Sequence, residues 1–383
     1  MSRHDFSSAE FARRLTATRQ AIAQAGLDWL IAIHPVSIHW LTGSDAKSYQ
    51  AFQCLFVGAN GEPLTMLVRA AECAEYEQDT VAETVIGWGG NEPEDPMMAF
   101  DRLVRKLVLP GQRVGIEVPG YYLHPHHYEA IKSLLGQALA LEANSLIPTL
   151  KAAKSAEELV HVREAARNAD RAMGVFAQSL AVGRSEFEVA GEVYRSLVAH
   201  GGLAASTLNL VSGSRAAFSH GNPSARRLEM GDTGNIEFGG VAKRYTVTIG
   251  RQFSMGPPSA RVRELFDIVC DAADACRAKM RDGARAIDCH EAAKAVIARA
   301  GYDAYRIHTT GYGIAPGFPP VWGEPVNMFG GSQDILRAGM VISIEPPIFI
   351  PEEHIGVRAI DNVLITETGT ELLTRFPRDI IVA

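Results

Sequence analysis

A change of hydrophobic pattern at Lys154–Glu158 constrains the fold of this 383-residue chain more than any other feature. Before it, short apolar runs such as Trp29–Ile33, Cys54–Val57 and Leu64–Val68 alternate with segments of helical spacing, which predicts an α/β unit. After it, long helical patterns alternate with strands that are expected to pair antiparallel. The second half has neither βαβ spacing nor a Gly-rich phosphate loop, so we expect an α+β layer fold there.

A helix-capping sequence marks the start of the second unit. Ser155 is followed three residues later by Glu158, which is the spacing of a capping box, and the apolar residues from Leu159 onward share one face of a long helix. We therefore expect two domains, at residues 1–150 and 151–383.

Several local predictions accompany this division. The turn Ala59–Glu62 lies between two apolar runs and predicts a hairpin. The apolar segment Leu146–Pro148 predicts a short strand before the boundary. In the second domain, paired strands are expected at Leu208–Gly213, Gly234–Gly240 and Arg244–Phe253.

Composition excludes some classes of function. The net charge of −7 and the lack of basic runs argue against a nucleic-acid surface. The five cysteines have no paired spacing, which is typical of free thiols in a reducing cytosol. The N-terminus is polar, and no apolar run approaches the roughly 18 residues of a membrane-spanning helix. We expect a cytoplasmic protein without membrane or nucleic-acid partners.

Two glutamates stand where a simple core would not place them. Glu237 lies inside the apolar strand Asn235–Gly240, and Glu345 ends the apolar run Ile342–Ile344. A carboxylate in such a place is costly unless it is paired or functional. If the two lie close together, repulsion would raise the pKa of one of them and permit acid–base chemistry.

Two loops supply further candidate residues. His220 lies among small and turn-forming residues in Phe218–Pro223, from where it could reach a cleft or face solvent. Tyr312 and Trp322 belong to a Gly/Pro/aromatic segment that is typical either of a pocket lining or of a packed surface loop.

These stretches, in this order, resemble the pita-bread superfamily of methionine aminopeptidase, prolidase, creatinase and ectoine hydrolase. Ile38–Gly43, which includes Trp40, resembles the creatinase/prolidase N-terminal domain, and Lys154–Glu158 resembles the entry to the catalytic domain. The resemblance implies a creatinase-like N-terminal α/β domain followed by a pita-bread catalytic domain. It also implies a homodimer.

The same resemblance implies that metal ligands are missing. The metallopeptidase members hold two metal ions with two Asp, one His and two Glu. Of these positions, Glu345 matches the first Glu, while the others carry Glu237, Thr248, Tyr312 and Ile360, with Asp361 beside the last. Thr, Tyr and Ile are not a normal ligand set. We therefore expect no metal and no other cofactor, as in the metal-free members of the superfamily.

Among those members, ectoine hydrolase resembles the chain more closely than creatinase does, in three segments. These are Glu237–Arg251, the segment from Tyr312 to Trp322, and the neighbourhood of Trp40. The resemblance implies that Glu237 attacks the substrate carbon or holds a water against it, and that His220 carries the proton. Further roles are implied for Tyr312, Trp322 and Tyr245 around a cationic ring, and for Arg251 or Arg358 at a carboxylate.

The sequence thus predicts a metal-independent hydrolase of a non-peptide C–N bond in a small zwitterionic compound, most closely resembling ectoine hydrolase. A creatinase-like amidinohydrolase is an alternative, with Glu237 and Glu345 holding a guanidinium. The further alternatives are an Xaa-Pro-type peptidase homologue and a pita-bread protein that binds without catalysis.

Overall fold

The computed structural model describes residues 2–45, 48–118, 120–203 and 208–383, and it separates the chain into two compact units, Met1–Lys151 and Ala152–Ala383. The division falls one residue from the boundary expected at the capping sequence. Each unit has its own sheets and its own hydrophobic clusters, and each is described by itself.

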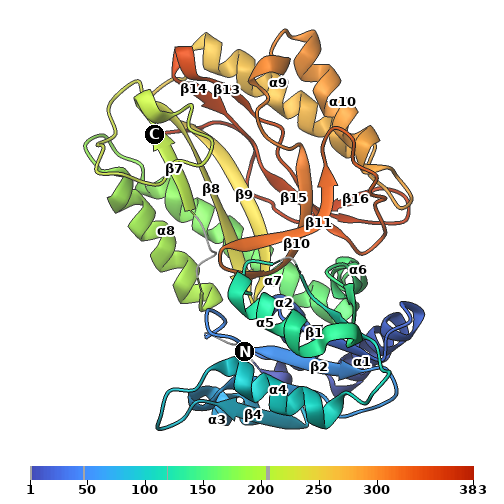
Figure 1. The fold of residues 1–383 in the computed structure, drawn as a ribbon. Helices are drawn as coiled ribbons and strands as arrows, with labels where there is room; N and C mark the ends of the chain where they lie inside the picture. The colour runs from blue at the N-terminus through green and yellow to red at the C-terminus, as the bar shows by residue number, and fades with distance from the viewer. Residues whose placement is uncertain (1, 46–47, 119, 204–207) are drawn as a thin grey trace. The chain divides into compact units, whose positions relative to one another are not determined.

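The first unit is a six-stranded mixed sheet with the strand order β4-β3-β2-β1-β5-β6. The antiparallel pair β2 and β3 forms the hairpin expected at the turn Ala59–Glu62. The strands are β1 Trp29–Ala32, β2 Cys54–Gly58, β3 Thr65–Arg69, β4 Thr84–Trp88, β5 Val114–Ile116 and β6 Leu139–Glu142. The helices are α1 Ser8–Gln24, α2 Pro35–Thr42, α3 Cys73–Asp79, α4 Pro96–Leu107, α5 Pro125–Leu135 and α6 Leu146–Ala152 (Figure 1).

Alternation along β1 shows how this sheet is buried on both faces. Trp29 and Ile31 pack in one cluster with α4 and α5, whereas Leu30 and Ala32 pack in the other with α1 and α2. Successive side chains of a strand point to opposite faces, so four consecutive apolar residues serve two cores. The strand expected at Leu146–Pro148 is wrong, because these residues begin helix α6.

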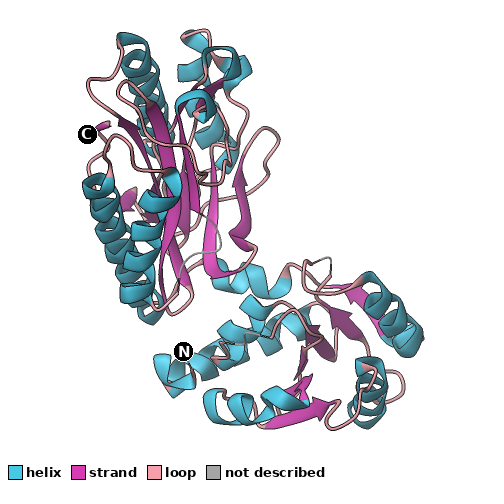
Figure 2. Cartoon of the chain, turned by 90° about the vertical axis from the view of Figure 1, so that its left-hand side faces the viewer, coloured by secondary structure: helices cyan, strands magenta, loops and turns pink. Residues whose placement is uncertain are grey.

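The second unit has a nine-stranded sheet whose main path is β16-β15-β12-β10-β9-β8-β7, with β11 paired to β10 and β17 paired to β9. A small sheet of β13 and β14, labelled in Figure 1, completes it, and Figure 2 shows the strands of this unit with helices on both sides. The strands are β7 Leu208–Ser212, β8 Thr233–Ala242, β9 Tyr245–Ser254, β10 Gly311–Phe318, β11 Val321–Met328, β12 Val341–Ile344, β13 Ile348–Ile350, β14 Ile355–Val357, β15 Asp361–Ile365, β16 Thr370–Leu372 and β17 Ile381–Val382. The helices are α7 Ala156–Ser179, α8 Glu186–Gly201, α9 Ala260–Arg277 and α10 Ala286–Arg299.

Two helix pairs cover this sheet, each with its own core. Helices α7 and α8 pack against β7, β8 and β9, and helices α9 and α10 pack against β12 and β15. The predicted capping box is present, because Ser155 Oγ accepts from Glu158 N at 3.2 Å and Glu158 Oε2 accepts from Ser155 N at 2.8 Å. The central strands β8 and β9 are buried over almost their whole length, so that polar residues such as Glu237, Thr248 and Arg251 are buried with them.

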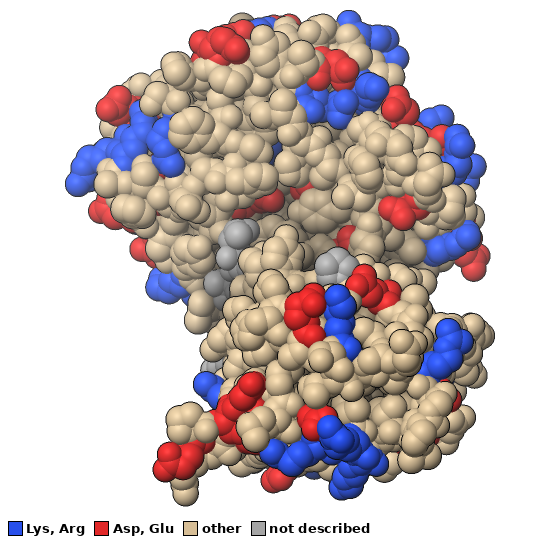
Figure 3. All heavy atoms as spheres, in the orientation of Figure 1, with Lys and Arg blue, Asp and Glu red and all other residues tan. Residues whose placement is uncertain are grey.

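The surface carries charges of both signs. On the face drawn in Figure 3, Lys and Arg side chains are interspersed with Asp and Glu side chains. Among the helices of the described segments, none combines the length and the apolar character needed to span a bilayer.

Candidate active site

Glu237 lies in the middle of β8 and is one centre of the candidate site. The strand places it opposite Gly250 of β9, and its side chain is buried. The Glu237 carboxylate forms an ion pair with Arg358 Nη1, and its Oε2 also accepts from Asn209 Nδ2 of β7 at 3.0 Å. Ionic pairing and hydrogen bonding together compensate for the burial of this charge.

Arg358 directly follows β14 and contacts several parts of the site. Its Nη2 donates to the carbonyl of Ser219, which lies in the loop between β7 and β8, and its guanidinium carbon lies 5.2 Å from the centre of the Phe349 ring. Its Nε is buried without a protein acceptor among the described residues. Arg358 therefore joins the loop to β8 and retains one N–H for another partner.

Glu345 is the second buried carboxyl and has a different environment. Ser343 Oγ donates to its Oε2 at 3.0 Å, while its Oε1 is buried with no partner in the described part of the chain. Burial, and then the negative charge of Glu237, raise the pKa of Glu345 well above its usual value. The protonated form of Glu345 is therefore favoured relative to that of an exposed glutamate, and its Oε1 is left for a ligand.

Two histidines stand beside this acid. His308 Nδ1 lies 3.7 Å from Glu345 Oε1, and the rings of His308 and His220 have their centres 5.2 Å apart. Burial is the main cause that lowers the pKa of His308, with Arg358 and His220 adding to it, so the ring is neutral at pH 7. Nδ1 also lies 3.2 Å from the carbonyl of Thr309, which favours the tautomer that leaves Nε2 as a base.

The aromatic pair predicted to line a pocket is also found here. Trp322 Nε1 of β11 donates to the hydroxyl of Tyr312 of β10 at 3.0 Å. Burial, and then the charges of Glu345 and Glu237, raise the pKa of Tyr312 well above its usual value, so the phenol keeps its proton. The structure thus brings together most of the predicted site residues, namely Glu237, Glu345, His220, Tyr312, Trp322 and Arg358.

Three residues predicted to contact the substrate have side chains that are engaged elsewhere in the structure. Tyr245 is 1% exposed and donates to Glu158 Oε1 at 2.8 Å. Arg251 is fully buried, where it donates to Asp361 Oδ1 and to four backbone carbonyls. Trp40 is 1% exposed in the core of the first unit, 5.3 Å from the guanidinium of Arg14.

The expected role of Arg358 also needs correction. Its Nη1 and Nη2 are already bonded to Glu237 and Ser219, so the planar fork that would grip a substrate carboxylate is occupied. For the same reason, Glu237 does not need a cationic substrate to balance its charge. The sequence did not predict His308 or Asn209 as site residues. His308 lies four residues before Tyr312 in the segment that leads into β10, and this proximity was the available signal for the histidine.

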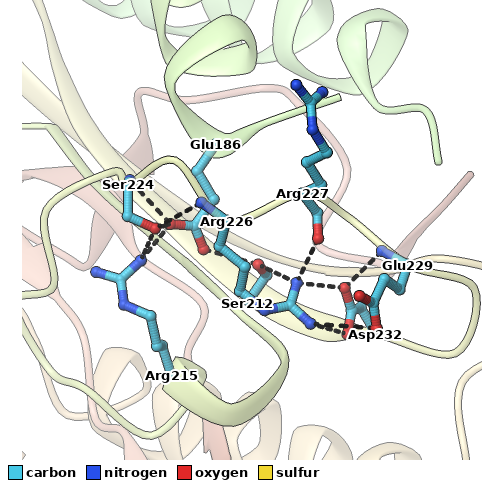
Figure 4. Close-up of polar contacts among 8 residues, drawn as sticks. All are labelled: Glu186, Ser212, Arg215, Ser224, Arg226, Arg227, Glu229 and Asp232. Atoms are coloured by element: carbon cyan, nitrogen blue, oxygen red, sulfur yellow. Dashed lines mark hydrogen bonds and ion pairs between the residues drawn. The ribbon is translucent and has the colours of Figure 1, made fainter. Parts of the chain in front are cut away.

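The loop that carries Ser219 and His220 is fixed at its base by a second buried network (Figure 4). Glu186, in the first turn of α8, accepts from Ser212 Oγ at 2.7 Å, from Ser224 N and Oγ at 2.9 and 2.6 Å, and from Arg215. Arg226 forms a bidentate pair with Asp232, at 2.5 and 2.7 Å. These contacts hold both ends of the loop, and hence His220, in register with the sheet.

The donor atoms at the site determine whether it can hold metal ions. In segments 2–45, 48–118, 120–203 and 208–383, no group of three or more His, Cys, Asp or Glu residues is arranged to hold a metal ion. At the family's ligand positions, Thr248 Oγ1 accepts from Asn362 Nδ2 at 2.8 Å and Ile360 offers no donor atom. These residues do not fit a pair of metal ions.

Comparison with known proteins agrees with this architecture. Residues 14–152 match the creatinase/prolidase N-terminal domain, and residues 160–367 match metallopeptidase family M24. The probable dipeptidase PepE of Mycobacterium tuberculosis is 30% identical over 100% of this chain and 99% of the relative. The ectoine hydrolase of Halomonas elongata is 27% identical over 98% of each chain. The crystal structure of dipeptidase PepE from Mycobacterium ulcerans has a TM-score of 0.86 at 28% identity, covering 98% of this chain and 99% of that one.

Fold and site together define a creatinase-type N-terminal domain followed by a pita-bread catalytic domain. The chain belongs to metallopeptidase family M24. The prediction of an ectoine hydrolase-like enzyme acting on a non-peptide C–N bond is wrong, because similarity is greater to proteins named as dipeptidases than to ectoine hydrolase. The alternative of a creatinase-like amidinohydrolase also required cleavage of a non-peptide C–N bond, so the same comparison overturns it.

Proposed function

We propose that this chain is a hydrolase of the dipeptidase type, which binds a short peptide in the pita-bread domain and cleaves its amide bond with protein groups alone. The observation that carries the proposal is the pair of unpartnered buried atoms, Glu345 Oε1 and Arg358 Nε, beside two imidazoles. A buried polar atom without a partner costs free energy, and a peptide carbonyl oxygen would satisfy both donors.

Each group then has a chemical task. The protonated Glu345 and Arg358 Nε donate to the carbonyl oxygen and stabilise the charge that develops on it. The Tyr312 phenol is a further neutral donor near the two carboxyl groups. Glu237 keeps the Arg358 guanidinium in place through its ion pair and is a positioning residue in this scheme.

Hydrolysis balances without any other reactant than water. The water oxygen bonds to the carbonyl carbon, and the C–N bond breaks. The imidazole pair of His308 and His220 takes the proton from the attacking water and returns it to the leaving nitrogen. Glu345 ends the cycle in the protonated form in which it began.

A second candidate function is peptide binding without turnover. It is favoured by the residues at the family's ligand positions, where Thr248 is bonded to Asn362 and Tyr312 is bonded to Trp322. The groups that would receive the peptide are the same in both cases, and the two candidates differ only in whether the imidazole pair activates water.

The test is proline release from Ala-Pro by protein dialysed against a chelator, with and without added Mn²⁺. We expect turnover that survives chelation and does not rise with Mn²⁺. Calorimetric binding of Ala-Pro without turnover would favour the binding protein. Activity that appears only with Mn²⁺ would contradict the metal-free step, and neither binding nor turnover would contradict the proposed function itself.

A further inference from the structure

The tight turn between β8 and β9 has an unusual backbone. Its two central residues, Lys243 and Arg244, both have left-handed φ values, of 51° and 66°. Two-residue hairpin turns with this backbone favour Asn and Gly, because a Cβ atom crowds the following carbonyl oxygen in the left-handed region. Two long basic side chains therefore stand here against their conformational preference, and a contact elsewhere in the fold must compensate.

Arg244 makes such a contact with the end of β10. Its guanidinium carbon lies 4.3 Å from the centre of the Phe318 ring, in a cation–π arrangement. The Arg244 carbonyl accepts from the backbone N–H of Gly317 at 2.5 Å, and the next residue, Tyr245, is paired with Pro316. Three consecutive residues of β10 are thus attached to the strained turn.

The attached end of β10 leads directly to the aromatic pair of the candidate site. Phe318 pairs with Val321 of β11, and Trp322 is the next residue along the chain. Trp322 lies beside Gly317, since a Cβ atom added to Gly317 would be 3.5 Å from Trp322 Cβ. Trp322 Nε1 in turn donates to the hydroxyl of Tyr312 at 3.0 Å. A displacement of the turn would therefore reach the pair of Trp322 and Tyr312.

We infer that Arg244 is a positioning residue for Trp322, and that it sets the affinity for the peptide substrate without taking part in the chemistry. The inference rests on the proposed function, in which Trp322 and Tyr312 belong to the site. Glycine would suit the backbone of the turn better, but it has no side chain to place over Phe318. The left-handed conformation of Arg244 is retained because it brings the guanidinium to that ring and so fixes the connection between β10 and β11.

The experiment measures hydrolysis of Ala-Pro by the full-length protein and by two glycine variants of the turn. Lys243→Gly is the matched control, because it relaxes the same turn and leaves Arg244 over Phe318, and its KM should stay within about twofold of the wild type. Arg244→Gly relaxes the turn as well but removes the guanidinium, and it should raise KM about 3- to 10-fold with kcat within about twofold. Arg244→Lys keeps a cation and should recover part of the loss.

A double-mutant cycle tests whether Arg244 acts through Trp322. In the Trp322→Phe background, Arg244→Gly should raise KM by less than about twofold, because the residue that it positions is already changed. The same factor in both backgrounds, or equal KM values for Arg244→Gly and Lys243→Gly, would overturn the inference while the proposed function stands. If Ala-Pro is bound without turnover, its Kd replaces KM in both comparisons.

A spectroscopic measurement decides the inference if Ala-Pro is neither bound nor hydrolysed, in which case the proposed function fails. Labelling with fluorotryptophan gives one fluorine resonance for each of the four tryptophans, and the resonance that disappears in Trp322→Phe belongs to Trp322. Arg244→Gly should shift or broaden this resonance, whereas Lys243→Gly should leave it at the wild-type position. An unchanged Trp322 resonance in Arg244→Gly would overturn the positioning role.

Discussion

Two fully buried glutamates of the second unit have opposite surroundings. Glu186 accepts from two serine hydroxyls, a backbone N–H and an arginine, whereas Glu345 receives one hydroxyl and leaves Oε1 without a partner. Burial, and then the negative charge of Glu237, raise the pKa of Glu345, and the single hydrogen bond from Ser343 only partly opposes this. A buried carboxyl group whose oxygens are all hydrogen-bonded to the protein supports the structure. A buried carboxyl group with an oxygen that has no partner is available to a ligand.

The largest expected effect is the loss of turnover on substitution of Glu345, the glutamate with an unpartnered oxygen. Glu345→Gln keeps the shape but removes the acidic proton, and it should lower kcat for Ala-Pro by about 10²- to 10⁴-fold. At pH 4, below the range in which the raised pKa affects stability, the free energy of unfolding should change by no more than about 1 kcal/mol. A variant that turns over normally would show that Glu345 is a structural residue like Glu186.

The pH dependence of stability sharpens the same contrast. The folded-state pKa of Glu345 is raised above the unfolded value of 4.5, so the fold binds this proton more tightly than the unfolded chain does. Its contribution is fully present below pH 4.5 and is lost as pH rises toward the raised pKa. Denaturant unfolding of the wild type should therefore show a decline in that range that is reduced in Glu345→Gln. Identical pH profiles would contradict the raised pKa.

Substitution of Glu186, whose oxygens are hydrogen-bonded to the protein, should affect stability more than turnover. Glu186→Gln weakens hydrogen bonds to a charged, buried group and should lower the unfolding free energy by about 2–3 kcal/mol. Since the loop with His220 depends on this anchor, kcat should fall by less than in Glu345→Gln. Glu192→Gln is the control, because Glu192 is a partly exposed residue of α8 in a surface ion pair with Arg195, and it should change stability by about 0.5 kcal/mol or less. A Glu186→Gln variant as stable as that control would contradict the anchoring role.

The smallest effect is expected at the aromatic pair. Trp322→Phe removes the N–H donated to Tyr312, a bond of about 0.5–1.5 kcal/mol, and should raise KM two- to tenfold. Trp88→Phe removes a similar indole bond, to the carbonyl of Phe52 at 2.9 Å in the first unit, and should leave KM unchanged. Equal KM values for the two variants would separate Trp322 from the substrate.

Local signals predicted local structure well. The capping box of Ser155 and Glu158 and the hairpin at Ala59–Glu62 are present because each depends on neighbours within a few residues. The segment Leu146–Pro148 was misassigned, since three apolar residues have no period that distinguishes a strand from a helix.

The site was predicted in its residue types but not in its pairings. Glu237 meets Arg358 across 121 positions of sequence, and Arg251 meets Asp361 across 110. Such pairs decide which charged side chains remain free for a ligand, and no local pattern reports them. For this reason Arg251 and Tyr245 were expected at the substrate, whereas the fold uses both internally.

The residues at the family's ligand positions also bear on how this chain can evolve. Thr248 and Ile360 are almost fully buried, and both flank the part of β9 that faces Glu237. A single change to Asp or Glu at either position would bury a new negative charge beside existing carboxyl groups, at a cost of several kcal/mol. Each such substitution toward a metal-ligand set would therefore produce a destabilised intermediate. The present packing therefore disfavours the gain of a single carboxylate at either position, and a ligand set would require several coordinated changes.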